Sequence, residues 1–268
     1  MEDLKDKVAV VTGGASGIGL ATALALARRG THCVLADIEK QALDAAVDQL
    51  RGLGVEAEGF VTDVADRAAV VALADGAFDR FGRVHIVFNN AGVAIFGPSH
   101  ETPHDDWRWV IDVDLWGPIH GVEVFVPRLI EQGEGGHVLA TASFAGVVPN
   151  VGLGPYCVAK YGVVALMEVL ARELRHHGIG ASVLCPMRVR TNIDASVRNR
   201  QAEYGGPRAA VGLDVDEDQM AGSLIPVDEV AELVVDGIRR NRLYLFPHPE
   251  ARDFIRRRFD RIDRAFEE

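Results

Sequence analysis

Cysteine is scarce in this sequence. Among 268 residues there are only three, Cys33, Cys157 and Cys185, which lie far apart in apolar segments. An odd number of such cysteines predicts buried thiols rather than disulfides or metal ligands, and it suits a reducing compartment. The nine histidines show no spacing typical of a metal site either, so we expect no bound metal.

Basic charge and long apolar runs are also lacking. The 28 Lys and Arg residues face 39 Asp and Glu residues, giving a net charge of −11, which argues against nucleic acid or an anionic membrane as a partner. No apolar run approaches the roughly 20 residues of a spanning helix. The acidic start, 1–6, lacks the basic flank of a signal peptide. We therefore expect a soluble, cytoplasmic protein that acts on a small molecule.

The chain alternates short β-branched runs with helical patterns. Strands are predicted at 7–12, 32–36, 56–61, 84–88, 137–141, 179–185 and 243–246. The first helix is predicted to end near Gly30. The others are predicted to span 39–53, 66–81, 103–113, 115–132, 154–177, 227–241 and 249–268. This alternation predicts an α/β fold: one doubly wound, Rossmann-type domain over 1–268 with a seven-stranded parallel sheet. The irregular stretch 187–224, which contains an acidic cluster, is predicted to be a substrate lid.

A glycine-rich turn, Thr12–Gly19, joins the first predicted strand to the first helix. Its glycines permit a tight turn and a close approach of the backbone, while the helix N-terminus offers free N–H groups to a pyrophosphate. The turn therefore predicts a dinucleotide site, with contacts at Gly13, Ser16, Gly17, Ile18 and Gly19.

The second predicted strand ends at Asp37, close to the ~20-residue spacing at which an acidic residue meets the adenosine ribose. A carboxylate there would bond the ribose hydroxyls and repel a 2′-phosphate, and Ile38 offers no compensating positive charge. Asp37 therefore predicts NAD rather than NADP. A helix cap for 39–53 is a compatible second role.

Polar and small residues, Asn89–Gly92, follow the fourth predicted strand. Open α/β sheets bind ligands at the carboxyl ends of their strands. The segment is predicted to serve as a turn, a ligand contact, or both.

Ser143, Tyr156 and Lys160 form the candidate catalytic group. Tyr156 and Lys160 are one turn apart in a predicted helix and should share a face. The positive charge is expected to lower the pKa of Tyr156, as a general acid/base for an alcohol requires, and Ser143 could hold the substrate oxygen. Taken alone, Tyr-x-x-x-Lys is more often an ordinary piece of amphipathic helix.

In order and spacing, these motifs resemble the short-chain dehydrogenase/reductase family over nearly the whole chain. The resemblance implies that Ser143, Tyr156 and Lys160 are catalytic and that Asp63 and Val64 contact adenine. Further cofactor contacts are implied at Asn90, Gly92, Tyr156, Lys160, Pro186, Val189 and Thr191.

Two positions depart from the family pattern. Asp114 stands where the family usually has an Asn that supports a water relay to the catalytic Lys, so Asp114 is predicted to take this relay role. Either its backbone carbonyl or its carboxylate would carry the relay. Met187 replaces the usual Gly after Pro186, and its bulk is expected to narrow the nicotinamide pocket.

Three shorter segments, Phe96–Pro98, Thr191–Ile193 and Tyr244–Glu250, look like those of dehydrogenases of lignin-derived aryl alcohols. Apolar residues also occur where the family lines its substrate pocket: Ile95, Phe96, Phe144, Val147, Val148, Val151 and Leu153. Burial in the core is the competing explanation for each of them.

We therefore predict an oxidoreductase that transfers a hydride between NAD(H) and a secondary alcohol or ketone, apolar or aromatic, with Tyr156 as general acid/base. An NADP-dependent ketoreductase and a non-catalytic NAD sensor are the alternatives. The resemblance also implies a homodimer or homotetramer paired through helices 115–132 and 154–177. The apolar stripe of helix 249–268 would dock on its own subunit or on a neighbour.

Overall fold

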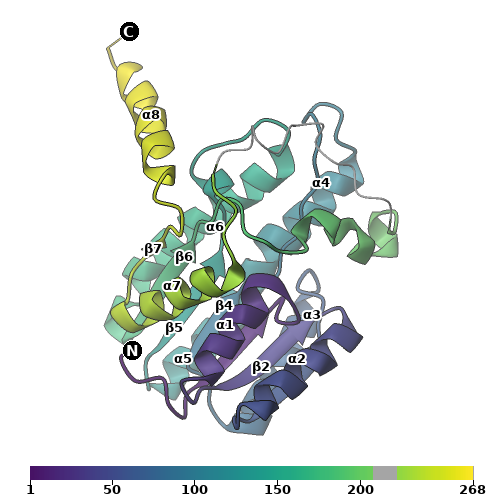
Figure 1. The fold of residues 1–268 in the computed structure, drawn as a ribbon, viewed down its shortest axis with the longest axis vertical. Coiled ribbons are helices and arrows are strands. Elements are labelled where there is room, and N and C mark those ends of the chain that lie inside the picture. The colour runs from purple at the N-terminus through teal and green to yellow at the C-terminus, as the bar shows by residue number, and fades with distance from the viewer. Residues whose placement is uncertain (208–221, 268) are drawn as a thin grey trace.

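The computed structural model describes residues 1–207 and 222–267. Parallel strands form one seven-stranded sheet in the order β3-β2-β1-β4-β5-β6-β7 (Figure 1). The strands are β1 (Val8–Thr12), β2 (His32–Asp37), β3 (Ala57–Val61), β4 (Ile86–Asn89), β5 (Gly136–Thr141), β6 (Ile179–Leu184) and β7 (Tyr244–Leu245). The helices are α1 (Gly17–Ala27), α2 (Lys40–Gly52), α3 (Arg67–Phe81), α4 (His104–Ile111), α5 (Gly117–Gln132), α6 (Gly154–Glu173), α7 (Val227–Arg240) and α8 (Ala251–Arg264). The predicted doubly wound α/β fold is confirmed.

The order of the strands reverses at β1. Val10 in this central strand pairs with Val34 of β2 on one side and with Val87 of β4 on the other. The chain thus builds outward to β3, returns to the centre and builds outward again to β7. Such a reversal leaves a crevice outside the carboxyl ends of β1 and β4, where sheets of this kind bind ligands.

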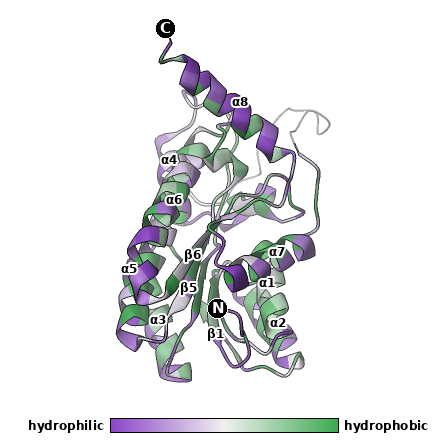
Figure 2. Ribbon diagram, turned by 90° about the vertical axis from the view of Figure 1, so that its left-hand side faces the viewer, coloured by the Kyte–Doolittle hydropathy of each residue, from purple (hydrophilic) through white to green (hydrophobic). Residues whose placement is uncertain are grey.

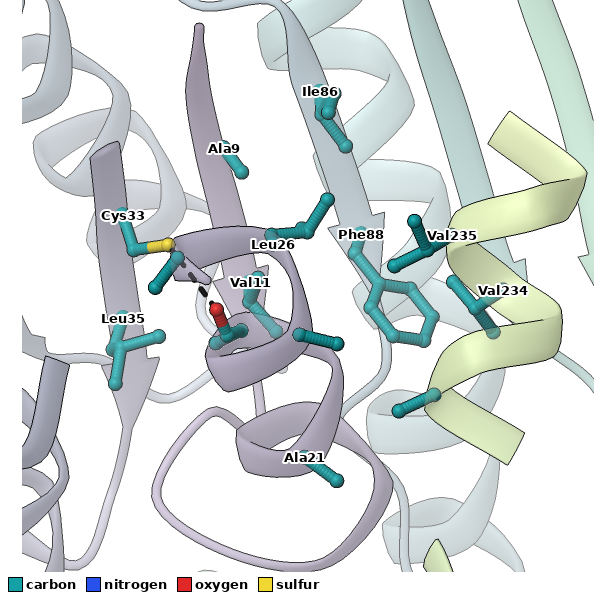
Figure 3. Close-up of a cluster of buried hydrophobic side chains, with 14 of the residues drawn as sticks. Ala9, Val11, Ala21, Leu26, Cys33, Leu35, Ile86, Phe88, Val234 and Val235 are labelled. Carbon is teal, nitrogen blue, oxygen red and sulfur yellow. Dashed lines mark hydrogen bonds between the residues drawn. The ribbon is translucent and has the colours of Figure 1, made fainter. Parts of the chain in front are cut away.

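Helices cover both faces of the sheet, as the view along it shows (Figure 2). On one face α1 and α7 pack against alternate residues of β1, Ala9 and Val11, together with Phe88 of β4 (Figure 3). Because successive side chains of a strand point to opposite faces, Val8 and Val10 join the second core, under α3, α5 and α6.

All three cysteines are free and buried, as predicted. Cys33 lies in the first core, where its thiol contacts the carbonyl of Ala23 at 3.7 Å (Figure 3). Burial raises the pKa of the Cys33 and Cys185 thiols to about 12. These two thiols therefore act as small apolar side chains rather than nucleophiles.

In the described part of the chain, α6 is long and apolar enough to cross a membrane, judged by length and composition. Its residues Val163, Met167 and Leu170 are instead buried against the sheet. Packing of this kind is typical of the core helix of an α/β domain.

Helices α4 and α5 are continuous, whereas the sequence predicted a break near Asp114. A π-helical turn, Asp112–Trp116, joins them, and the N–H of Gly117 bonds the carbonyl of Asp112 five residues earlier. The wider turn places an extra residue in the helix and shifts its apolar period, which explains the false break.

Other differences concern the ends of elements. Helix α6 ends at Glu173, and Arg175–His177 forms a separate 3-10 turn. Within the predicted lid, two 3-10 helices occupy Ile193–Asn199 and Ala202–Tyr204. The predicted acidic cluster, 214–218, lies outside the described residues.

Candidate active site

Asn90 ties together the carboxyl ends of three strands. Its side-chain amide donates to the carbonyls of Thr12 (3.1 Å) and Gly13 (3.2 Å), and its oxygen accepts from the hydroxyl of Thr141 at 2.9 Å. The Thr12 hydroxyl in turn accepts the N–H groups of Asn90 (3.0 Å) and Ala91 (3.1 Å). The edge of the crevice is therefore built on β1, β4 and β5 at once.

The turn after β1 requires glycine at two of its positions. Gly13 has a φ of +61°, and a Cβ atom there would lie 2.8 Å from the Cα of Ala91. A Cβ at Gly19 would lie 2.2 Å from the carbonyl oxygen of Gly13. Glycine thus allows the turn to press against the strand ends.

The N-terminus of α1 fits a pyrophosphate. Ser16, its N-cap residue, makes no side-chain cap bond, and no acidic residue stands in its first turn. The first N–H groups of the helix are thus free of side-chain acceptors. A dinucleotide would be held here by Gly13, Ser16 and Gly17, all of which line the crevice.

The carboxylate of Asp37 is fixed at the end of β2. One oxygen accepts the N–H of Ala15 at 3.0 Å and the other accepts the N–H of Glu39 at 3.1 Å. Burial raises the pKa of Asp37, and these two hydrogen bonds oppose that rise. Because Glu39 is the residue that precedes α2, Asp37 is not the helix cap that the sequence also allowed.

Lys160 is buried, with 2% of its surface exposed. Its ammonium group donates to the carbonyl of Thr141 at 3.1 Å and lies 3.3 Å from a carboxylate oxygen of Asp114. The same nitrogen is 5.4 Å from the centre of the Tyr156 ring. Tyr156, Lys160 and Asp114 are therefore one cluster, although Asp114 comes from a different helix.

Asp114 is fully buried on the π-helical turn. Its second oxygen accepts the N–H of Val93 at 2.7 Å. Burial raises the pKa of its carboxyl group, and the charge of Lys160 opposes that rise. The carboxylate itself therefore faces Lys160, which puts it in a position to exchange a proton with this group.

The pKa of Tyr156 moves in the opposite direction to the prediction. Burial raises it most, the negative charge of Asp114 raises it further, and a hydrogen bond with Ser143 lowers it. The expected lowering by Lys160 is wrong for the protein on its own, because burial of the phenol and the negative charge of Asp114 raise the pKa of Tyr156 instead.

Ser143 follows β5 and reaches the loop after β6. Its hydroxyl accepts the N–H of Ala145 at 3.1 Å and donates to the carbonyl of Pro186 at 3.4 Å. It also contacts Tyr156 through the hydrogen bond that lowers the pKa of that residue. Ser143 and Tyr156 are thus placed to contact one substrate oxygen.

One crevice brings most of the predicted residues together. Those in its lining are Gly13, Ser16, Gly17, Ile18, Asp37, Asp63, Val64, Asn90, Gly92, Tyr156, Lys160 and Thr191. Ser143, Asp114, Gly19, Pro186 and Val189 are not in this lining. The side chain of Met187 lies against Gly222 and is not in this lining either, and its narrowing of the nicotinamide pocket stays a prediction.

None of the seven apolar residues expected around the substrate lines this crevice. Ile95 is in a core cluster, and Val151 is 99% exposed. Apolar residues that do line the crevice include Val93, Trp109 and Val113.

A family model described as short chain dehydrogenase matches residues 7–202. The chain belongs to the short-chain dehydrogenase/reductase family. The predicted class of enzyme is thereby confirmed: this dehydrogenase is an oxidoreductase whose family transfers a hydride between a nicotinamide dinucleotide and an alcohol or ketone.

Two curated relatives are similar over almost the whole dehydrogenase. The C alpha-dehydrogenase of a Sphingobium species is 37% identical over 98% of this chain and 87% of its own. The 1-deoxy-11-beta-hydroxypentalenate dehydrogenase of Streptomyces exfoliatus is 35% identical over 97% of this chain and 89% of its own.

Solved structures agree with this assignment. A short-chain dehydrogenase/reductase from Burkholderia phymatum, in complex with NAD, superposes with a TM-score of 0.90 at 38% identity, over 98% of this chain and 96% of that one. The apo form of LigD from Sphingobium superposes with a TM-score of 0.81 at 34% identity, over 97% of each chain. The NAD in the Burkholderia complex agrees with the cofactor predicted here.

Within the predicted lid, a segment of the dehydrogenase crosses the adenosine end of the crevice through contacts that sequence reasoning missed. We call residues 192–204 the strap. Arg198 and Asn199 donate to one carboxylate oxygen of Glu39 at 2.5 and 2.7 Å, and Gln201 donates to Asp63 at 2.5 Å. No local sequence pattern predicts these contacts, because the partners are more than 130 residues apart in the chain.

Helix α4 anchors the strap. Arg200 and Asp106 form an ion pair at 2.5 Å in which both side chains are 5% exposed. Trp109 donates from its indole nitrogen to Gln201 at 3.0 Å, and Tyr204 donates to Asp112 at 2.9 Å.

In residues 1–207 and 222–267, no group of three or more His, Cys, Asp or Glu residues gathers as a metal site would.

We predict that replacing Asp37 shifts the dehydrogenase toward NADP. Asp37→Ala removes the charge that repels a 2′-phosphate, and adding Ile38→Arg supplies a partner for it. The kcat/KM ratio of NADP to NAD should rise at least about tenfold in the double variant. A wild-type preference for NADP would contradict this interpretation of Asp37.

We predict that Asp114→Asn moves the pH–rate profile of alcohol oxidation to lower pH. The change deletes a negative charge that raises the pKa of Tyr156, so the phenolate should form at lower pH, while the plateau rate changes by less than about tenfold. Asp112→Asn, on the same π-helical turn, is the matched control and should leave the profile in place. An unchanged or upward-shifted profile in Asp114→Asn would exclude this electrostatic role.

Proposed function

We propose that the protein is an NAD-dependent dehydrogenase of an apolar or aromatic secondary alcohol. The observation that carries this proposal is the cluster of Ser143, Tyr156 and Lys160 beside a dinucleotide crevice. Asp37 at the ribose position supports NAD, and the similarity to a C alpha-dehydrogenase and to a 1-deoxy-11-beta-hydroxypentalenate dehydrogenase supports a secondary alcohol as substrate.

Each side chain of the site has a separate role in the proposed reaction. NAD, held at the glycine turn, supplies the acceptor for the hydride. In the oxidising direction the phenol oxygen of Tyr156, as phenolate, takes the hydroxyl proton of the substrate, and Ser143 holds the substrate oxygen. The ammonium of Lys160 favours the phenolate, and Asp114 links that ammonium to the proton relay.

Both alternatives to this function are less well supported. An NADP-dependent enzyme would need a positive group near Asp37, but Arg198, which lies nearby, is paired with Glu39. A non-catalytic NAD sensor has no need of an acid/base group, whereas Ser143, Tyr156 and Lys160 are all present and in contact through hydrogen bonds or charge.

We propose that Tyr156→Phe abolishes oxidation of every alcohol that the wild type accepts. A panel of aryl and alicyclic secondary alcohols, assayed with NAD by the absorbance of NADH, should show the rate falling by about 10²–10⁴ or more, with NADH binding nearly intact. Tyr161→Phe is the matched control on the same helix and should retain activity, since Tyr161 is absent from the lining of the crevice.

Near-normal turnover in Tyr156→Phe would remove this residue from the mechanism. A wild-type protein that binds NADH tightly but oxidises no alcohol on the panel would favour the sensor instead.

We further propose a cytoplasmic homodimer or homotetramer. Exposed apolar residues lie on the helices predicted to pair: Trp116 is 47% exposed, Val158 53% and Val169 50%. Such residues on neighbouring helix surfaces support burial by a second subunit.

Helix α8 supports assembly through a neighbouring subunit. It projects from the body of the molecule in both views (Figures 1 and 2), and its first half packs back: Phe254 is edge-on to Phe144 at 5.7 Å, and the guanidinium of Arg258 lies 5.3 Å from the centre of the Tyr161 ring. Farther along, Phe259, Ile262 and Phe266 are 55%, 42% and 87% exposed. The exposed stripe favours docking on a neighbour over docking on its own subunit.

We predict that Phe259→Asp with Ile262→Asp weakens the assembly, because a carboxylate cannot be buried in an apolar contact. Sedimentation velocity at micromolar concentration should show a smaller species than the wild type. Leu53→Asp, at an exposed apolar position at the end of α2, is the control and should not dissociate the oligomer. A monomeric wild type would refute the assembly itself, and an unchanged oligomer in the double variant would exclude an essential role for α8.

A further inference from the structure

The loop after β6 is joined to a distant part of the chain beyond the strap. Ile225 donates its N–H to the carbonyl of Arg188 at 3.2 Å and accepts the N–H of Arg190 at 3.1 Å. A parallel bridge also pairs Val189 with Ile225. Residues 188–190 and Ile225, which lie before and after the strap in the chain, are therefore paired. We call this pairing the base of the strap.

His248 is buried at this base, with 1% of its surface exposed. Its Nδ1 accepts the N–H of Met187 at 3.2 Å. Its Nε2 faces two carbonyl oxygens, of Arg188 at 3.2 Å and Ser223 at 3.0 Å. Because carbonyl oxygens only accept hydrogen bonds, Nε2 must carry the hydrogen atom and Nδ1 must be the acceptor. One imidazole ring therefore bonds both the loop after β6 and Ser223.

Glu250 adds a second connection to the same place. One of its carboxylate oxygens accepts both the N–H and the hydroxyl of Ser223 at 2.9 Å. Next to Ser223, Gly222 has a φ of +99°, and a Cβ there would lie 2.9 Å from the Cβ of Met187. Without a side chain at 222, the segments before and after the strap can approach closely beside the bulky Met187.

The loop held in this way touches both halves of the active site. At its start, the carbonyl of Pro186 accepts the N–H of Phe144 at 2.8 Å and the hydroxyl of Ser143 at 3.4 Å. At its end, Thr191 lines the crevice, and its Cγ2 would lie 3.3 Å from a Cβ at Gly17. The loop therefore contacts both the segment of Ser143 and the glycine turn.

We propose that His248 and Glu250 form a clamp that positions the loop 186–191 for dinucleotide binding. His248 is a positioning residue, since it touches backbone groups of the loop and of Ser223 and is absent from the lining of the crevice. The proposal rests on the function proposed above and gives a role to the segment Tyr244–Glu250, which the catalytic chemistry leaves unused.

A histidine series tests the clamp by direct binding of NADH. Trp109 lines the crevice, so energy transfer from tryptophan to bound NADH reports occupancy without turnover. His248→Phe keeps an aromatic ring but removes both nitrogens, and it should weaken NADH binding and raise the KM for NAD about tenfold. The kcat at saturating NAD should fall less than about threefold, because Tyr156 and Lys160 stay in place.

His248→Gln restores a donor toward the two carbonyls and should bring NADH affinity back to within about threefold of wild type. The matched control is His85→Phe. His85 is equally buried, accepts the N–H of Val8 at 3.0 Å and faces Glu134, but lies outside the crevice lining. Its replacement should lower the melting temperature and leave NADH affinity unchanged.

Glu250→Ala removes the exposed half of the clamp, should fold without difficulty, and should weaken NADH binding about threefold in the same direction. Wild-type affinity in the folded His248→Phe protein, or in Glu250→Ala if His248→Phe does not fold, would overturn the clamp. Failure of the proposed function looks different: the wild type would bind NADH, with the same dependence on His248, yet oxidise no alcohol.

Discussion

The active site depends on the burial of one ammonium group. Removing the charge of Lys160 from water costs several kcal/mol unless oxygen atoms replace the water. One of those atoms is the carbonyl of Thr141, at the end of β5, and another is the carboxylate of Asp114, on the π-helical turn. Because one partner belongs to the sheet and the other to a helix, satisfying the charge fixes α6 against both. Tyr156, one turn earlier on α6, is fixed by the same contacts.

The carboxylate at position 114 changes the electrostatics of that arrangement. An amide at this position would leave the ammonium field largely free to favour the phenolate of Tyr156. A carboxylate 3.3 Å from Lys160 compensates the field and adds its own repulsion. The pair satisfies a buried charge more completely and makes Tyr156 a weaker acid. The carboxylate thus lowers the acidity of Tyr156 while it gives the buried ammonium a charged partner.

Much of this site could be predicted because its residues follow strands. Thr12, Asn90 and Ser143 each come just after a β-branched run, and parallel strands bring their carboxyl ends to one edge. The π-helical turn could not be predicted, since a single extra residue resembles a break in the apolar period. The contacts of the strap could not be predicted either: Gln201 and Asp63 meet across 138 positions, and no local propensity encodes such a pair. The predicted direction of the pKa shift of Tyr156 was wrong because it left out the burial of the phenol and the charge of Asp114, which comes from outside α6.

The strap joins two kinds of contact with different energies. Arg200 of the strap and Asp106 of α4 are buried together. Breaking such a pair leaves an uncompensated charge that costs about 3–5 kcal/mol. By contrast, Arg198 and Glu39 are more than a third exposed, and pairs of this type contribute about 0–1 kcal/mol. The buried pair with Asp106 therefore holds the strap more strongly than the exposed pair with Glu39 does. Because α4 continues through the π-helical turn to Asp114, the anchor of the strap and the Asp114–Lys160 pair stand on one continuous helix.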